Sequence, residues 1–233
     1  NGRNGQFTKA MYYENARIHI DGRGLLGYGR KTITDQSAGI KTIQVNSFDN
    51  TFFEPLPKSS IVSTTGTPVK TISGSFYSFK NYSYGTNGQK HYLIYPDTSS
   101  QYDYLKRTKE KSTFTYTTND FLHGNWSLAN AKYYNVANAT PSLVATAIMT
   151  NTFESFNNGR FYRQKSFLAT KQRPGKSDHK SKKTYDFISS ASNKISKEII
   201  SYFTDSGRED RDKDTVSYLY DAQGIITQQI SQF

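Results

Sequence analysis

Short segments with alternating apolar and polar residues recur along the whole chain, and turn-forming clusters separate them. Alternation with a period of two gives a β-strand one apolar and one polar face. The clusters include Asn87-Gly88 and Asn157-Asn158-Gly159, and Asn-Gly is favoured in hairpins because both residues accept positive φ. This pattern predicts an all-β fold, an antiparallel meander of repeated hairpins. The alternating segments are residues 17–21, 31–35, 40–45, 75–79, 92–95, 112–117 and 216–220.

Helical periodicity is weak throughout the chain. Residues 191–203 place Ile195, Ile199 and Ile200 near helical spacing, but alternation and β-branching favour a strand there. Residues 125–130 are interpreted as a short helix or a turn. Aromatic residues form 15% of the chain, whereas hydrophobic residues as a whole form only 34%. We therefore expect a core built from rings, which suit strands with one buried and one wet face.

The clearest hairpin motif lies at the C-terminal end. Tyr218 and Tyr220 are two residues apart, so a strand would place both rings on one face. Asp221 follows and is expected to accept a hydrogen bond from the turn backbone. Gly224 is expected to take a positive φ, which strains other residues, and a second strand then returns.

Related patterns of aromatic residue, acid, turn and returning strand occur upstream and indicate an internal repeat. The successive steps from Gly124 to Gly159, Asn193 and Gly224 are 35, 34 and 31 residues. A near-constant period is typical of stacked units that cannot bury their own faces alone. The motif residues of the two clearest upstream copies are Phe153, Glu154, Gly159, Tyr185 and Asp186.

Two parts of the chain resemble a known family. Tyr220-Asp221-x-x-Gly224 followed by a strand is similar to the YD repeat of Rhs proteins and teneurins. The Gly-Arg-Gly-Leu-Leu-Gly element formed by Gly22, Arg23, Gly24 and Gly27 with two leucines resembles a stretch of the B component of insecticidal toxin complexes. The resemblance covers residues 12–70 and, more thinly, 112–233, and it leaves 71–111 unplaced.

The resemblance implies a segment of a spiralling YD-repeat sheet or shell. Residues 1–111 would form an N-terminal β region, continuous with degenerate YD-type repeats in residues 112–233. Its function would be structural and non-enzymatic: part of a secreted or cell-surface β-shell that encloses or presents a C-terminal polypeptide. The implied partners are the remainder of the parent polypeptide and its C-terminal cargo. The targeting signal would lie outside this chain.

Sequence patterns for chemistry are sparse. The chain has no Cys, which excludes disulfides and thiolate chemistry, and its 4 His residues show no ligand spacing. The pattern of Gly22, Gly24 and Gly27 fits G-x-G-x-x-G, but a predicted strand follows it instead of the helix that would hold a pyrophosphate. We therefore predict no catalytic residues, no metal site and no cofactor. No apolar run is long enough to predict a membrane span.

The formal net charge of +11 is concentrated in part in residues 163–183, which hold eight Lys and Arg residues and the single acid Asp178. We interpret this segment as a solvated loop. Nucleic-acid binding and docking on an acidic surface are alternatives, and nucleic acid is not the predicted partner. Residues 206–215 interleave acids with cations and are interpreted as a solvated charged turn.

The alternative function is a carbohydrate- or cell-surface-binding adhesin module. Trp126 with Tyr133 and Tyr134 would supply an aromatic platform for a cell-surface glycan. Packing within a hairpin is the interpretation that we favour for these rings.

Overall fold

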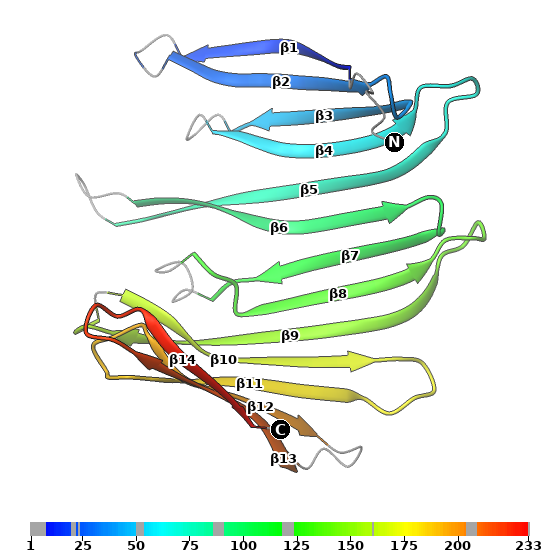
Figure 1. Cartoon of the computed structure of the whole chain (residues 1–233). Coiled ribbons are helices and arrows are strands. Elements are labelled where there is room, and N and C mark those ends of the chain that lie inside the picture. The colour runs from blue at the N-terminus through cyan, green and yellow to red at the C-terminus, as the bar shows by residue number, and fades with distance from the viewer. Residues whose placement is uncertain are drawn as a thin grey trace, which may run out of the picture. The chain divides into compact units, whose positions relative to one another are not determined.

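A computed structural model describes residues 8–19, 22, 24–49, 54–85, 91–117, 124–159, 161–203 and 209–232. Every regular element in these residues is a β-strand, and the fourteen strands are hydrogen-bonded in chain order from β1 to β14 (Figure 1). The strand pairs with a described register are all antiparallel, and β1 and β14 are not paired with each other. The predicted all-β antiparallel meander is therefore confirmed, as an open sheet.

The strands are β1 Lys9–His19, β2 Gly24–Asp35, β3 Ile40–Phe48, β4 Pro55–Thr64, β5 Thr71–Tyr84, β6 His91–Asp103, β7 Thr108–Thr115, β8 Leu128–Asn135, β9 Ser142–Phe156, β10 Phe161–Gln172, β11 His179–Phe187, β12 Ile195–Phe203, β13 Glu209–Tyr220 and β14 Ile226–Gln232.

In the described residues the alternating segments fall on or overlap strands, and the segment at 191–203 contains β12, as predicted; residues 20 and 21 lie outside the described residues. Residues 125–130 hold no helix; they lead into β8, which begins at Leu128. The loop interpretation of residues 163–183 is wrong, because they form most of the β10–β11 hairpin. The uncharged run of residues 166–170 lies between its cations and pairs with β11, so the number of cations alone did not indicate a loop. The charged-turn interpretation of 206–215 is also wrong from Glu209 onward, where β13 begins.

The chain divides into two compact units. The first comprises residues 1–112 and 133–142, and the second comprises 113–132 and 143–233. The first cut lies one residue from the boundary predicted from the sequence, whereas residues 133–142 group with the first unit.

Each hairpin that joins an odd-numbered strand to the next strand, where its register is described, carries one register shift; the shift lies nearer the turn, except in β5–β6, where it lies at the middle of the pairing. A β-bulge adds a residue to one strand and increases the local right-handed twist. The shared feature of the repeats is therefore a bulged hairpin. The shifts lie at Arg17/Ile18, Val45/Asn46, Ser78/Phe79, Gln164/Ser166, Asp186/Phe187 and Leu219/Tyr220.

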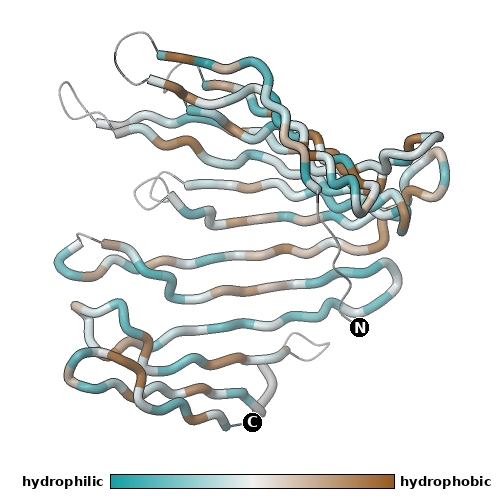
Figure 2. The backbone as a smooth tube through the Cα atoms, turned by 45° about the horizontal axis from the view of Figure 1, so that its top comes forward, coloured by the Kyte–Doolittle hydropathy of each residue, from teal (hydrophilic) through white to brown (hydrophobic). Residues whose placement is uncertain are grey.

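Burial is shallow among the described residues. The buried apolar side chains are only Ala129, Ala131 and Ala145, and no large side chain is fully buried. Apolar and polar segments alternate along the strands (Figure 2), as a sheet with two accessible faces requires. Large apolar residues such as Met11, Leu143 and Ile230 are correspondingly exposed.

Candidate functional site

The last residues of β2, β4, β6 and β8 each cap the turn that follows them. In each case a side-chain oxygen accepts a backbone N–H of the turn at 2.8–2.9 Å. These side chains satisfy turn donors that the sheet leaves unpaired. The acceptor and donor residues are Asp35 with Ala38, Thr64 with Lys70, Asp103 with Lys106, and Asn135 with Ala137.

The residue after each of these caps donates its backbone N–H to an earlier segment of the first unit, at 2.8–3.1 Å. These bonds connect the turn after each of the four strands to an earlier segment of the chain. The repeat is therefore visible as a recurring hydrogen bond. The sequence motif did not reveal this series. Tyr102-Asp103 begins like the hairpin motif, but no glycine follows it in the turn. Arg107 takes the positive φ of that turn, 54°. The bonds run from Gln36 to Thr8, Thr65 to Gly39, Tyr104 to Ile72 and Val136 to Arg107.

The hairpin of β13 and β14 has the conformation that its sequence predicts. Gly224 has φ 81°, and Asp221 Oδ1 accepts the Ile225 N–H at 2.8 Å. The Asp221 carbonyl also accepts the Gly224 N–H at 3.0 Å. Half-buried Tyr218 and Tyr220 flank Leu219, which is 50% exposed, so the two rings lie on the same face of β13.

The acids of the two upstream copies have different roles. Gly159 has the predicted positive φ, 78°, after Asn157 and Asn158 with φ 51° and 58°. Glu154, however, pairs across the sheet with Arg163 and does not cap this turn; Phe153 precedes it on β9, opposite Gln164.

The third copy departs further from the motif. Tyr185 and Asp186 lie inside β11, opposite Glu198 and Lys197, and the connection begins only after Phe187. The three copies therefore share a bulged hairpin and not one arrangement of the acid.

Arg163 is the most highly connected charged side chain in the second unit. Its Nε and Nη2 atoms lie 2.8 and 2.7 Å from Glu154 Oε1, and its side chain is 11% exposed. Nη1 donates to the carbonyls of Ser189, at 3.0 Å, and Ser192. The guanidinium also lies over the rings of Phe187 and Phe156, 3.8 and 5.3 Å from their centroids. Arg163 thus connects the β9–β10 hairpin to the turn between β11 and β12.

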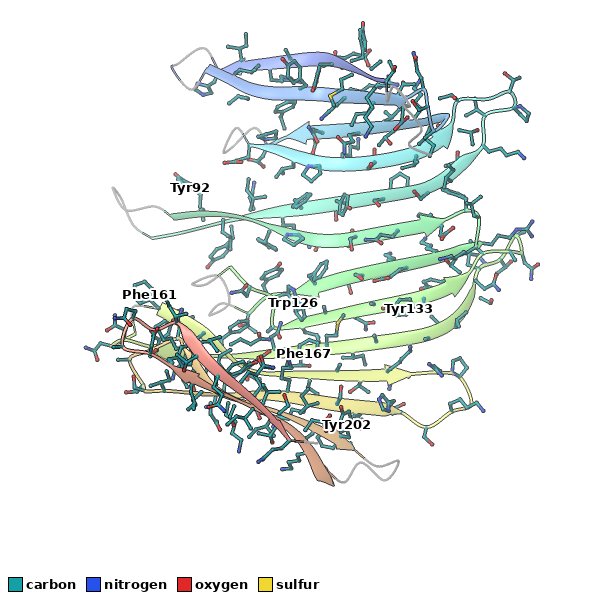
Figure 3. All side chains as sticks on the ribbon, in the orientation of Figure 1. Tyr92, Trp126, Tyr133, Phe161, Phe167 and Tyr202 are labelled. Carbon is teal, nitrogen blue, oxygen red and sulfur yellow. The ribbon has the colours of Figure 1, made fainter. Side chains whose placement is uncertain are left out.

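A second contact joins that turn to the β13–β14 hairpin. Tyr220 Oη donates to the Ile195 carbonyl at 2.8 Å, and Lys194 Nζ lies 5.6 Å from the Tyr220 ring centroid. Phe161, which begins β10 (Figure 3), packs its ring 5.6 Å from that of Phe156. Sequence reasoning missed Arg163 because it is one of eight cations in residues 163–183, and it missed Lys194 because a lone lysine has no motif.

Replacing Gly224 with alanine is expected to destabilise the second unit by about 1–2 kcal/mol. Its φ of 81° is unfavourable for a residue with a Cβ, whereas the flexible end of the Lys194 side chain can move away from that Cβ at little cost. Urea denaturation followed by circular dichroism measures the change. Gly66→Ala is the matched control, because Gly66 has an open environment and no positive φ. Equal stability of the two variants would contradict the assigned turn.

The Gly-Arg-Gly-Leu-Leu-Gly element leads into β2 and forms its first residues. Gly22, Gly24 and Gly27 have φ 102°, 70° and 130°, conformations that favour glycine, and Arg23 lies outside the described residues. Gly24 and Gly27 belong to a strand, so the G-x-G-x-x-G pattern does not open a helix. The helix N-terminus that holds a dinucleotide phosphate is therefore not formed by this strand.

The proposed aromatic platform is not formed as a set of three rings. Tyr133 and Tyr134 are neighbours on β8, so their side chains point to opposite faces of the sheet. Trp126, labelled in Figure 3, packs 6.1 Å from Phe114, measured between ring centroids. Its carbonyl accepts the Asn151 Nδ2–H at 3.2 Å. This hairpin packing accounts for the tryptophan without a ligand.

Ionisable side chains meet across the middle of the second unit. Lys183 Nζ lies 2.9 Å from Glu198 Oε2 and 5.8 Å from the Tyr185 ring centroid. The hydrogen bond to Glu198 raises the pKa of Lys183 above its ordinary value of 10.5. Burial, with a smaller contribution from Glu198, raises the pKa values of Tyr185 and Tyr218 above 10.0.

These pKa shifts predict that the second unit loses stability in alkaline solution. A raised folded-state pKa gives stability that is complete below the unfolded pKa, near 10, and is lost as pH rises through the folded pKa. Denaturation midpoints measured from pH 8 upward should therefore fall above about pH 10. The double variant Tyr185→Phe with Tyr218→Phe should show a smaller fall. An equal fall in both proteins would contradict this assignment.

The described residues show no group of three or more His, Cys, Asp or Glu side chains able to hold a metal ion. In the same part of the chain, no helix is long and apolar enough to cross a membrane. Comparison with protein-family models and with curated proteins finds no match for this chain.

Proposed function

We propose that this chain is a non-enzymatic wall segment of a β-shell of the YD-repeat (Rhs) type, and that the shell encloses or presents a C-terminal polypeptide. The observation that supports this most strongly is the repeated bulged hairpin, found from Arg17/Ile18 in the first unit to Leu219/Tyr220 in the second. A bulge in every such hairpin adds twist in the same sense each time. A long meander with this property suits a curved wall.

The shallow burial supports a role within a larger assembly. Val144, Ile188 and Leu219 are each at least 50% exposed, and further large apolar side chains share this state. Full burial of one such side chain stabilises a protein by about 1.5–3 kcal/mol. A wall that faces an enclosed polypeptide would cover part of this surface, and the remaining parent polypeptide would cover more.

The two end strands of the sheet differ in how open they are to further pairing. β1 carries charges at Lys9, Glu14 and Arg17, a positive φ of 57° at Asn15 and a register shift, all of which discourage strand addition. β14 has the sequence ITQQISQ, with no charge, proline or glycine, and all of it is exposed. The wall is therefore proposed to continue through β14.

Hydrogen–deuterium exchange of the isolated chain and of the same chain within a longer parent polypeptide tests this function. Amides of β14 that do not bond to β13 should exchange rapidly in the isolated chain and become protected within the parent. Amides at the centre of β3 serve as the internal reference, because both neighbours of this strand are present in each sample. Identical exchange of β14 in both samples would overturn the proposal.

A further inference from the structure

A groove of about 810 Å³ lies in the first unit and is lined by residues of β1, β2, β3 and β4. Two register shifts border it, at Arg17/Ile18 and Val45/Asn46, and Asn15 has φ 57° within β1. Bulges often re-aim side chains beside binding sites. Gly29 stands against Asn15, where an added Cβ would lie 3.0 Å from the asparagine Cβ. The groove therefore depends on local backbone features that an ordinary hairpin lacks.

Two guanidinium groups line the groove. Arg17 lies over the Phe48 ring, 5.3 Å from its centroid. Arg30 Nε lies 3.3 Å from Glu14 Oε2, yet this Nε is buried and has no hydrogen-bond acceptor among the described residues. Glu14 thus offsets one of the two positive charges without satisfying Arg30 by hydrogen bonding. Arg17, Arg30 and Glu14 together leave the groove with one uncompensated positive charge.

The rest of the lining is mainly apolar. Ile43, Val45 and Ile61 contribute to the groove, together with the Phe48 ring. Arginine recognises a planar carboxylate through two parallel hydrogen bonds, and an apolar lining favours an aromatic or aliphatic group beside it. A doubly charged phosphate would leave negative charge uncompensated here, because Glu14 already offsets one arginine.

We propose that this groove binds a carboxylate that carries an adjacent aromatic or aliphatic group. Arg17 and the terminal nitrogens of Arg30 contact the carboxylate, and the ring or chain lies against Val45, Ile61 and Phe48. The ligand is a small free carboxylate or the corresponding group of a peptide. This binding does not depend on the proposed wall function, since every lining residue belongs to the first unit.

Isothermal titration with phenylacetate and with its neutral analogue phenylacetamide tests the charge requirement. Phenylacetate should bind saturably, and phenylacetamide should bind at least about tenfold more weakly. Two peptides separate the sources of the carboxylate: N-acetyl-Gly-Phe presents it at the C-terminus, and N-acetyl-Glu-Phe-amide presents it on a side chain. Tighter binding of either peptide than of phenylacetate assigns a peptide ligand; otherwise the ligand is a small free carboxylate.

Three variants make the assignment specific to the groove. Arg17→Gln should weaken phenylacetate binding about tenfold, whereas Glu14→Gln should strengthen it a few-fold because it removes the competing carboxylate. Lys70→Gln, in the turn after β4, is the control of equal charge change and should leave binding unchanged. Glu14→Gln also keeps the test valid if an arginine variant fails to fold. The proposal is overturned if phenylacetate does not bind, if phenylacetamide binds equally well, or if Arg17→Gln and Lys70→Gln behave alike.

Discussion

Replacing Arg163 with alanine should destabilise the second unit by about 3–5 kcal/mol, the largest loss expected from any single substitution in this chain. The side chain is 11% exposed, and its removal leaves the Glu154 carboxylate without its closest cation. The carbonyls of Ser189 and Ser192 lose a donor, and the Phe187 ring loses the guanidinium stacked on it. Urea or thermal denaturation of the purified chain measures the effect.

Lys165→Ala is the matched control for this prediction. Lys165 lies on the same strand and pairs with the same Glu154, but at 3.6 Å and with 46% of its side chain exposed. Its loss should cost less than about 1 kcal/mol, because solvent screens exposed ion pairs. Arg163→Lys should fall between the two, since lysine keeps the charge but not the planar fork. Similar losses for Arg163→Ala and Lys165→Ala would refute the central position of Arg163.

The second large effect concerns self-association through the β14 edge. The isolated chain should associate as its concentration rises from micromolar to millimolar, because an open, uncharged edge pairs readily with another strand. The double variant Ile226→Lys with Ile230→Lys should raise the dissociation constant at least about tenfold through charge repulsion between paired edges. Sedimentation equilibrium measures the constant directly.

Ile188→Lys controls for general loss of apolar surface. Ile188 is 51% exposed, like Ile226, but it follows β11 and does not belong to an end strand of the sheet. If this variant weakens association as much as the β14 variant, the contact is a non-specific apolar one. A wild-type chain that stays monomeric throughout the concentration range would contradict the open edge itself.

Local patterns accounted for most of what the sequence predicted correctly. Alternation identified the strands because it depends only on neighbouring residues. The Tyr220-Asp221 hairpin was predictable because its hydrogen bonds join Asp221 to residues at most four positions away. The positive φ values of Gly224 and Gly159 follow from the same local chemistry.

Features that depend on register were not predictable. Glu154 faces Arg163 instead of its own turn because β9 pairs with β10 in a register that places these two residues opposite each other. The same pairing includes a register shift at Gln164/Ser166. The lysines of residues 163–183 suggested a loop through their number, although the uncharged run of residues 166–170 lies at the centre of the β10–β11 pairing. The caps at Thr64 and Asn135 escaped notice because neither residue is an acid, whereas the motif was defined by an aromatic residue followed by an acid.

The groove beside Arg17 and Arg30 also has no sequence signature. Its lining comes from residues 15–61, and two register shifts and the positive φ of Asn15 bring them together. The Gly-Arg-Gly element directs attention to Gly22 and Gly24, but the groove begins one strand earlier and uses Gly29. Only the pairing of β1, β2 and β3 identifies these residues as a set.

The proposed function places a C-terminal polypeptide after this chain in a parent protein, and protease protection of that polypeptide tests the enclosure claim most directly. The parent protein and the isolated C-terminal polypeptide are digested side by side, and the loss of the C-terminal polypeptide is followed over time by mass spectrometry. Enclosure predicts that this polypeptide survives at least about tenfold longer within the intact parent, because protease must wait for the wall to open. It also predicts that Arg163→Ala shortens this survival. Equal cleavage rates inside and outside the intact parent would contradict the shell.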